Sequence, residues 1–468
     1  MPLIYHSTRG QAPVLGFDDV LLAGLARDGG LYLPTRWPTL SAGDLRAMAG
    51  LSYAEIAVRV MGPFLDGSVA EDDFAQLVAD AYGGFDHAAV APLKQLGPND
   101  WLLELFHGPT LAFKDYALQL LGRLFDHVLS KKGQRVTIVG ATSGDTGSAA
   151  IEACRDRDAV DVVILHPHGR TSDVQRRQMT TVTAANVHNI ALEGTFDDCQ
   201  DLVKAMFNDQ AFRDEMHLSA VNSINWARIM AQIVYYVAAG TALGAPDRGL
   251  AFAVPTGNFG NVYAAFAARR MGLPISQLVV GSNSNDILTR FFETGEMRMG
   301  QVVPSLSPSM DIQVSSNFER YLFDLFAEDA TEVEARMGAF RQSGSFSVDH
   351  GRMAGVRAVF DGFRLDDDGT RRVIRQLFEE TGELIDPHSA VGIAAGRARR
   401  RDPAIPMVAL ATAHPAKFPD AVEAATGVRP PLPARLADLF DRSERYDVLP
   451  NDLAVVQDYV RRVARVAA

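Results

Sequence analysis

Short apolar runs alternate with helical stretches from about residue 100 to the end of the chain. The runs of strand length lie at 135–139, 161–165, 186–192, 250–254, 277–280 and 406–411. Strands that are almost continuously apolar belong to parallel sheets covered by helices on both faces. We therefore expect an α/β fold. Because ligands in such sheets bind beyond the carboxyl ends of the strands, the turns that follow the strands are the places to look for chemistry.

The length of the chain and changes in its pattern predict several parts. A chain of 468 residues holds about two to three domains of ordinary size. The first part looks mainly helical, with a turn at Asp28-Gly29-Gly30, and the last part looks helical and charged. We expect a mainly helical N-terminal domain at 1–95, a large α/β domain at 96–130 and 225–430, a small α/β domain at 131–224, and a helical C-terminal tail at 431–468.

The composition limits the class of partner. A net charge of −12 argues against binding to nucleic acid or to anionic membranes. We expect no signal peptide and no membrane span, because no apolar run approaches the roughly 18 residues that a span needs. Cys154 and Cys199 are too few for a disulfide framework or a zinc site, and they fit a reducing cytoplasm. We interpret His166 and His168 as part of a turn rather than as metal ligands.

The segment HGPTLAFKD at 107–115 follows a predicted strand at 101–106. Its turn ends at Thr110, which has the side chain of a helix cap, and Lys114 falls in the first turn of the following helix. The helix dipole disfavours a cation at that place and lowers the pKa of a lysine. A lysine that loses its proton can form an imine with an aldehyde and act as a base. The alternative is a surface lysine at a helix start.

The turn GATSGDTGS at 140–148 connects a strand to an Ala-rich helix. Its small residues allow backbone N–H groups to approach an anion, and its hydroxyls add donors. It is neither a P-loop, because Asp145 stands where that motif has lysine, nor a dinucleotide fingerprint. The pattern indicates a cradle for a carboxylate or a phosphate. Tight packing between helix and strand is the alternative.

Two further turns follow predicted strands. PTGNFGN at 255–261 has glycines and asparagines at a helix start, which is typical of a second anion site. ATAHPAKF at 411–418 offers the neutral hydroxyl of Thr412 and the cation of Lys417. We interpret His414, a lone histidine before proline, as structural.

The segment NSINWAR at 222–228 lies between the second and third turns along the sequence. If Asn225 begins a helix, Arg228 lies one turn further on the same face. An Asn/Ser/Arg group suits a phosphate, because the Arg fork makes two parallel contacts. The alternative is a capped helix with an exposed arginine.

These turns, in this order, resemble the threonine synthase family of pyridoxal-phosphate (PLP) enzymes. The matching segments are STRG, DGGLY, HGPTLAFKD, GATSGDTGSAA, PTGNFGN, MDIQVSSNFERYLF, IDPHSAVG and ATAHPAKF, which together run through nearly the whole chain except its last ~40 residues. The resemblance implies the tryptophan-synthase-β-like fold, PLP fold type II. It implies two parallel-sheet α/β domains and a mainly helical N-terminal region.

The resemblance also implies a role for each matching residue. Lys114 would hold PLP as a Schiff base and move protons. The cofactor phosphate would bind the loop of Gly257, Asn258, Phe259, Gly260 and Asn261, and Thr412 would contact the pyridine nitrogen. The substrate carboxylate and the cofactor ring would face Ser143, Gly144, Asp145, Thr146 and Gly147. The substrate phosphate would bind Ser223, Asn225 and Arg228. Asp145 stands where many related enzymes have an asparagine that contacts the ring oxygen.

The implied reaction converts O-phospho-L-homoserine and water into L-threonine and phosphate. We expect a cytoplasmic monomer or homodimer that acts on this small molecule without nucleic acid, membrane or metal. The nearest alternative is a PLP lyase on the same scaffold that deaminates its substrate to a keto acid. A non-catalytic regulator is a second alternative, against which Lys114 argues. A nucleotide-dependent kinase is a third, against which the failed P-loop argues.

Overall fold

The computed structural model describes residues 3–219 and 223–465, and the chain forms two compact units. Unit 1 contains residues 1–79, 85–107 and 223–430, and unit 2 contains residues 80–84, 108–222 and 431–468. Residues 108–130, expected in the large domain, and the expected separate tail both group with unit 2. The domain boundaries themselves stay a prediction.

Unit 1 is built on a six-stranded sheet with the strand order β13-β10-β9-β14-β4-β3. The strands are β3 (Leu93–Gly97), β4 (Asp100–Glu104), β9 (Leu250–Pro255), β10 (Ile275–Ser282), β13 (Phe360–Arg364) and β14 (Met407–Ala411). All neighbouring strands are parallel except the edge pair β3 and β4. The predicted parallel sheet is confirmed, with one antiparallel edge strand that the sequence did not predict.

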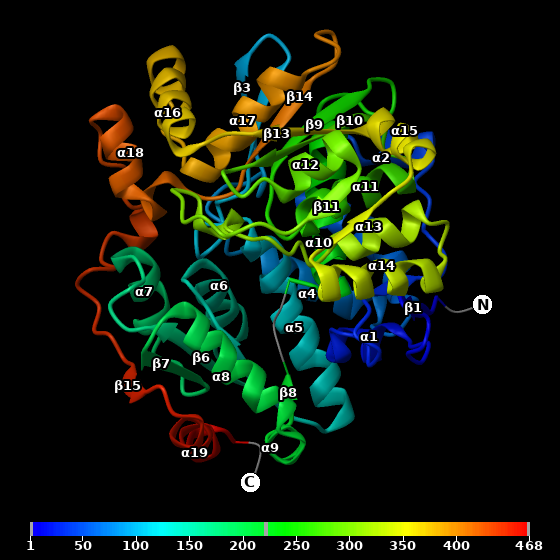
Figure 1. Ribbon diagram of the computed structural model, residues 1–468. Helices are drawn as coiled ribbons and strands as arrows, with labels where there is room; N and C mark the ends of the chain where they lie inside the picture. The colour runs from blue at the N-terminus through cyan, green and yellow to red at the C-terminus, as the bar shows by residue number, and fades with distance from the viewer. Residues whose placement is uncertain (1–2, 220–222, 466–468) are drawn as a thin grey trace. The chain divides into compact units, whose positions relative to one another are not determined.

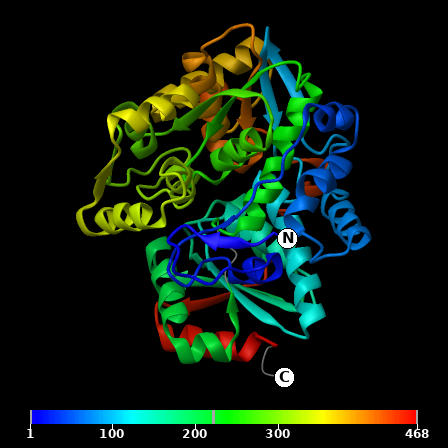
Figure 2. The same cartoon turned by 90° about the vertical axis from the view of Figure 1, so that its right-hand side faces the viewer.

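Helices cover both faces of this sheet (Figures 1 and 2). One face packs on α16 (Asp367–Thr381), α17 (Pro387–Arg399) and α18 (Pro419–Thr426), in a core with Leu377, Ile393 and Ala409. The other carries α10 (Trp226–Ala242), α11 (Gly260–Met271) and α12 (Ile287–Thr294). The remaining elements are β1 (Tyr5–Ser7), α1 (Phe17–Ala23), β2 (Tyr32–Pro34), α2 (Ala42–Met48), α3 (Tyr53–Leu65), α4 (Glu71–Tyr82), β11 (Glu296–Arg298), η1 (Pro308–Met310), α13 (Phe318–Leu325), α14 (Ala330–Ser343), β12 (Ser345–Ser347), α15 (His350–Val359) and η2 (Pro415–Lys417).

Unit 2 is built on a five-stranded sheet with the order β15-β7-β6-β5-β8, in which every neighbouring pair is parallel. The strands are β5 (Val136–Ala141), β6 (Val160–Pro167), β7 (Val187–Glu193), β8 (Leu218–Ser219) and β15 (Asp447–Pro450). The helices are α5 (Lys114–Lys132), α6 (Asp145–Cys154), α7 (Asp173–Thr180), α8 (Phe196–Asn208), α9 (Gln210–Glu215), η3 (Ala434–Leu436) and α19 (Leu453–Val463).

The two faces of the sheet in unit 2 are covered by different sets of helices. Val163, Leu165 and Ile190 point to a core shared with α8, α9 and α19. Figure 1 shows α8 beside the sheet, where it contacts β5 and β6. On the opposite face, α6 packs against α5, α7 and β6. This arrangement places the turn after β5, at residues 142–144, at the start of α6.

Several local predictions need correction. Part of the tail expected to be helical forms β15, which extends the sheet beside β7 because its backbone pairs there. His166 lies within β6 rather than in a turn, and only His168 lies in the turn. Thr110 does not cap α5, because Asp115 accepts hydrogen bonds from both its backbone N–H (2.8 Å) and its hydroxyl (2.6 Å).

Candidate active site

Lys114 is the first residue of α5, at the positive end of the helix, as predicted. Only 9% of the residue is exposed, so the alternative of a surface lysine is wrong. Its Nζ lies 3.5 Å from Oδ2 of Asp145, the first residue of α6 in the same unit. The first residues of two successive helices, α5 and α6, thus bring a buried amine and a buried carboxylate together.

The loop before α6 is held by Thr142, whose Oγ1 accepts hydrogen bonds from the N–H groups of Gly144 and Gly147 at 2.9 Å each. These two N–H groups are therefore engaged within the loop. Binding of an anion would fall to the backbone of Ser143, Asp145 and Thr146. Asp145 adds a negative charge to the loop, and its Oδ1 accepts a 2.8 Å hydrogen bond from Gln175 of α7.

The loop at 257–261 and Thr412 meet at one edge of the sheet in unit 1. β9 and β14 are parallel neighbours, so their carboxyl ends, which lead into the loop and into Thr412, lie side by side. Thr412 is 6% exposed, and its backbone N–H donates to Ser389 Oγ at 3.2 Å. The structure thus brings these two turns together.

The same loop presents backbone N–H groups in one direction. The carbonyl of Gly257 accepts from Ser315 Oγ at 2.7 Å, and the carbonyl of Asn258 accepts from the N–H of Asn317 at 3.0 Å. In a trans peptide the C=O and the following N–H point in opposite directions. The N–H groups of Asn258 and Phe259 therefore point away from the segment 315–317, as in an anion-binding nest.

Two residues of the loop have backbone constraints of different kinds: a left-handed conformation at Phe259 and close packing at Gly257. Phe259 has φ of 60°, in the left-handed region, and its ring packs among Phe318, Tyr321 and Phe360, so that only its backbone serves the loop. A Cβ on Gly257 would lie 2.9 Å from the carbonyl oxygen of Ser309. Glycine is therefore required there by close approach of two backbones.

Buried polar atoms without a hydrogen-bond partner among the described residues surround the start of α10 and α11. They are Nδ2 of Asn261 and the Nε and Nη1 of Arg228. The hydroxyls of Tyr235 and Tyr236 donate to Oδ1 of Asn261, at 2.6 and 2.7 Å. Orphaned buried donors are costly, so their presence indicates that an anion belongs there. These residues fit a phosphate group.

Arg228 is 3% exposed, so the alternative of a capped helix with an exposed arginine is wrong. Burial lowers the pKa of its guanidinium to about 10, which leaves it charged at neutral pH. Asn225 caps α10 by accepting from the N–H of Ala227 at 3.0 Å, and it donates to the carbonyl of Leu21 at 2.8 Å. Asn225 thereby fixes the helix that carries Arg228. Asn222, the first residue of the predicted segment, lies outside the described residues.

Ser223 lies next to a serine from a distant part of the chain. Its hydroxyl is 3.2 Å from that of Ser316, and its carbonyl accepts from Asn317 Nδ2 at 3.0 Å. Sequence reasoning missed the role of residues 315–317 and of Gln175, Tyr235 and Tyr236. Two signals were available: residues 315–317 belong to the matching segment MDIQVSSNFERYLF, and Gln175 follows Ser172 by three residues, as in a capping box.

Other features of the described residues stand outside this site. His414 caps η2 by accepting from the N–H of Ala416, which confirms its structural role. No group of three or more His, Cys, Asp or Glu side chains in residues 3–219 and 223–465 is arranged to hold a metal ion. No helix in those residues has both the length and the apolar character to cross a membrane.

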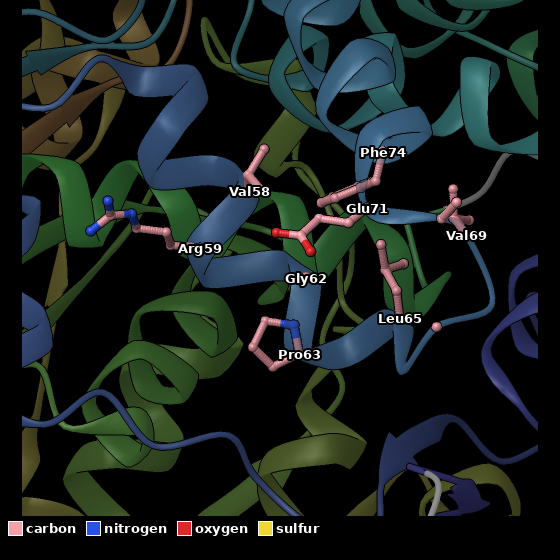
Figure 3. A pocket seen from close by; sticks show the side chains of 10 residues that line it. Val58, Arg59, Gly62, Pro63, Leu65, Val69, Glu71 and Phe74 are labelled. Atoms are coloured by element: carbon pink, nitrogen blue, oxygen red, sulfur yellow. The ribbon is translucent and has the colours of Figure 1, made fainter.

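A cavity of about 460 Å³ lies between α3, α4 and the turn that joins them. Figure 3 shows Glu71 reaching toward Gly62, while Arg59 points away from the other side chains. The lining is otherwise mostly apolar, and none of the predicted site residues belongs to it.

Comparison with known proteins agrees with this geometry. The sequence profile for the threonine synthase N terminus matches residues 4–82, that for pyridoxal-phosphate-dependent enzymes matches 87–355, and that for the threonine synthase C-terminal region matches 389–460. Threonine synthase from Pseudomonas aeruginosa is 59% identical over 457 residues, which cover 97% of this chain and 97% of that protein.

Solved structures give the same result. The crystal structure of PLP-bound threonine synthase from Brucella melitensis is 55% identical, with a TM-score of 0.98 over 99% of this chain and 100% of that chain. The crystal structure of threonine synthase from yeast is 37% identical, with a TM-score of 0.94 over 98% of each chain. The chain therefore belongs to the threonine synthase family of pyridoxal-phosphate-dependent enzymes.

Proposed function

We propose that this chain converts O-phospho-L-homoserine and water into L-threonine and phosphate, with Lys114 as its central catalytic residue. The observation that carries the proposal is a buried lysine at a helix N-terminus, 3.5 Å from a carboxylate, in a chain of this family. The reaction removes phosphate from Cγ and adds water at Cβ. Both steps need a base near the substrate's backbone carbons, which a lysine amine supplies.

Pyridoxal 5′-phosphate is the cofactor of this family, and its chemistry stabilises negative charge that develops at substrate carbons. The N–H groups of residues 257–261 would hold its phosphate, and Lys114 would hold its aldehyde carbon as a Schiff base. Thr412 would contact the ring nitrogen. Because a hydroxyl is neutral, it does not enforce a charged ring, and the cofactor withdraws electrons less strongly than it would beside a carboxylate.

Phosphate binding by the protein therefore has to contribute to the rate. Arg228 and Ser223 would bind the substrate phosphate, and Asn225 would hold the helix that carries Arg228. A preorganised cation at the leaving group stabilises the charge that develops on it. The backbone of residues 143–147 would face the substrate carboxylate. The freed Lys114 amine would take the proton from Cα.

The nearest competitor is a lyase of the same scaffold that deaminates the substrate. We expect purified protein, given O-phospho-L-homoserine and PLP, to form L-threonine and phosphate in equal amounts, and to lose this activity when PLP is removed. Formation of 2-oxobutyrate and ammonia in place of threonine would establish the lyase instead. Binding of ATP in a titration would support the kinase alternative.

We further propose that the protein works in the cytoplasm as a monomer or homodimer.

A further inference from the structure

A row of side chains in unit 2 leads from α7 to Lys114. Ser172 Oγ donates to Gln175 Oε1 at 2.9 Å, and Gln175 Nε2 donates to Asp145 Oδ1 at 2.8 Å. The other oxygen of Asp145 lies 3.5 Å from Lys114 Nζ. Because Ser172 occupies the amide oxygen, the amide nitrogen is the end of Gln175 that faces Asp145.

Burial and packing fix this row in place. Gln175 is 7% exposed and Asp145 is 6% exposed. Gly144 has φ of 144°, and a Cβ there would lie 2.5 Å from Gln175 Cδ, so the glutamine packs directly on the loop backbone. Asp115, the residue after Lys114, has both oxygens bound by Thr110. Thr110 therefore helps to orient Asp115, and Gln175 helps to orient Asp145.

We propose that Gln175 is a positioning residue that holds Asp145 against the Lys114 nitrogen. A hydrogen bond to one carboxylate oxygen keeps the group ionised and directs the other oxygen to the amine. Loss of that bond removes one partner of Asp145, in the loop proposed to bind the substrate carboxylate, where like charges repel. The first effect is on the Lys114 nitrogen, and the second is on binding of the substrate carboxylate. For the second effect the inference rests on the proposed function. In this role Gln175 acts through Asp145, to which it donates its hydrogen bond.

Absorption of the cofactor-loaded enzyme tests the first effect without turnover. A protonated Schiff base absorbs in the visible and an unprotonated one in the near ultraviolet. Gln175→Met keeps the length of the side chain but removes the donor. We expect it to lower the ratio of the visible to the ultraviolet band about threefold to tenfold at fixed pH. Gln175→Glu places a second carboxyl group beside Asp145. Two buried carboxyls this close share a proton, so the glutamic acid still donates to Asp145 and the ratio should stay near that of the wild type.

A lowered ratio in Gln175→Met beside a ratio near that of the wild type in Gln175→Glu separates positioning from loss of structure, because a loosened loop would shift both ratios alike. Gln457→Met is the matched control, since Gln457 Nε2 donates to Asp209 Oδ2 at 3.0 Å on the surface of the same unit. This control should leave the spectrum unchanged. Ser172→Ala retains the glutamine but frees its amide, and we expect a smaller shift in the direction of Gln175→Met.

Kinetics test the second effect. In Gln175→Met we expect KM for O-phospho-L-homoserine to rise about tenfold, by more than kcat falls. A wild-type spectrum and wild-type KM in Gln175→Met, or equal shifts of the spectrum in Gln175→Met and Gln175→Glu, would overturn the inference. If the wild-type protein forms no threonine, the proposed function fails, whereas the comparison of spectra still decides the role of Gln175.

Discussion

Arg228 carries a charge into the interior of unit 1 without a counter-ion among the described residues that would offset its desolvation. Its Nε and Nη1 have no hydrogen-bond partner among those residues, and burial lowers its pKa to about 10. An unpaired buried charge costs several kcal/mol. A residue that destabilises the free protein in this way is expected where a ligand anion supplies the missing charge.

This view predicts opposite effects on stability and on substrate use. Arg228→Met should raise the melting temperature of the ligand-free protein, because it removes an unpaired charge and fills the same space. It should also raise KM for O-phospho-L-homoserine about tenfold to a hundredfold, since a charged hydrogen bond is worth roughly 1.5–3 kcal/mol. Thermal melting and steady-state kinetics measure the two effects. A lower melting temperature with an unchanged KM would place Arg228 outside the phosphate site.

His166 makes a prediction about pH. Burial in β6 lowers its pKa to about 4, from an ordinary value of 6.5. Between these values the unfolded chain binds a proton that the folded chain does not, so stability falls as pH falls from 6.5 toward 4. The loss from this group reaches about 3 kcal/mol.

In His166→Phe this part of the pH dependence should disappear, because the variant binds no proton there. Urea unfolding at pH values near 7 and 4.5 measures the difference, and His168→Phe is the matched control because His168 is exposed. An equal fall of the free energy of unfolding in His166→Phe and in the wild type would contradict the assigned shift.

Sequence motifs predict the residues that carry the chemistry of the site. They do not predict the residues that hold those side chains and loops in place by hydrogen bonds. Thr412 stands directly after β14 and Lys114 opens α5, where residue type and local spacing reveal them. Gln175 meets Asp145 across 30 positions, and Asn317 meets Asn258 across 59. Neither contact has a sequence periodicity, because both depend on how separate elements pack.

The C-terminal segment 431–446 acts as a strap on the element that presents Lys114. Leu436 and Leu439 pack with Leu111 and Val174, and Arg435 donates to the carbonyl of Gly108. Further along the strap, Glu444 accepts hydrogen bonds from Arg176 and Thr180 of α7. The strap therefore touches both the loop before Lys114 and the helix that carries Gln175.

Leu439→Ala tests this connection. Leu439 is fully buried, so the cavity should cost about 2–5 kcal/mol of unfolding free energy. Because Leu439 packs on Leu111, three residues before Lys114, we also expect the variant to lose PLP faster on dialysis. Val455→Ala, at a position 40% exposed in α19 of the same unit, is the control. Loss of stability with wild-type retention of PLP would mean that the strap does not support the lysine loop.

The elements that sequence reasoning missed are short strands at or near sheet edges. β8 has two residues, β15 has four, and β13 lies at the edge beside β10. Such strands are too short for a periodic pattern and carry exposed side chains. The longer apolar strands were predicted to within two residues at each end, because buried strands give continuous apolar runs in the sequence.

At the scale of the whole chain, the local sequence pattern predicts the fold class. Contacts between residues far apart in the sequence decide which segments belong to which unit. Arg9 and Glu319 form a buried ion pair with a distance of 2.9 Å, which joins the N-terminal STRG motif to α13 in unit 1. The tail joins unit 2 through β15 and β7. Neither link is visible in composition or spacing, which is why the predicted domain boundaries differ from the two units.

The most direct test of the account locates the cofactor on the chain. Reduction of the PLP-loaded protein with borohydride fixes a Schiff base as a stable amine, and mass spectrometry of peptides identifies the lysine that carries it. We predict the label on Lys114 alone, and no label and no threonine formation in Lys114→Ala. Label on Lys417 or any other lysine of the wild-type protein, or full activity in Lys114→Ala, would contradict the account.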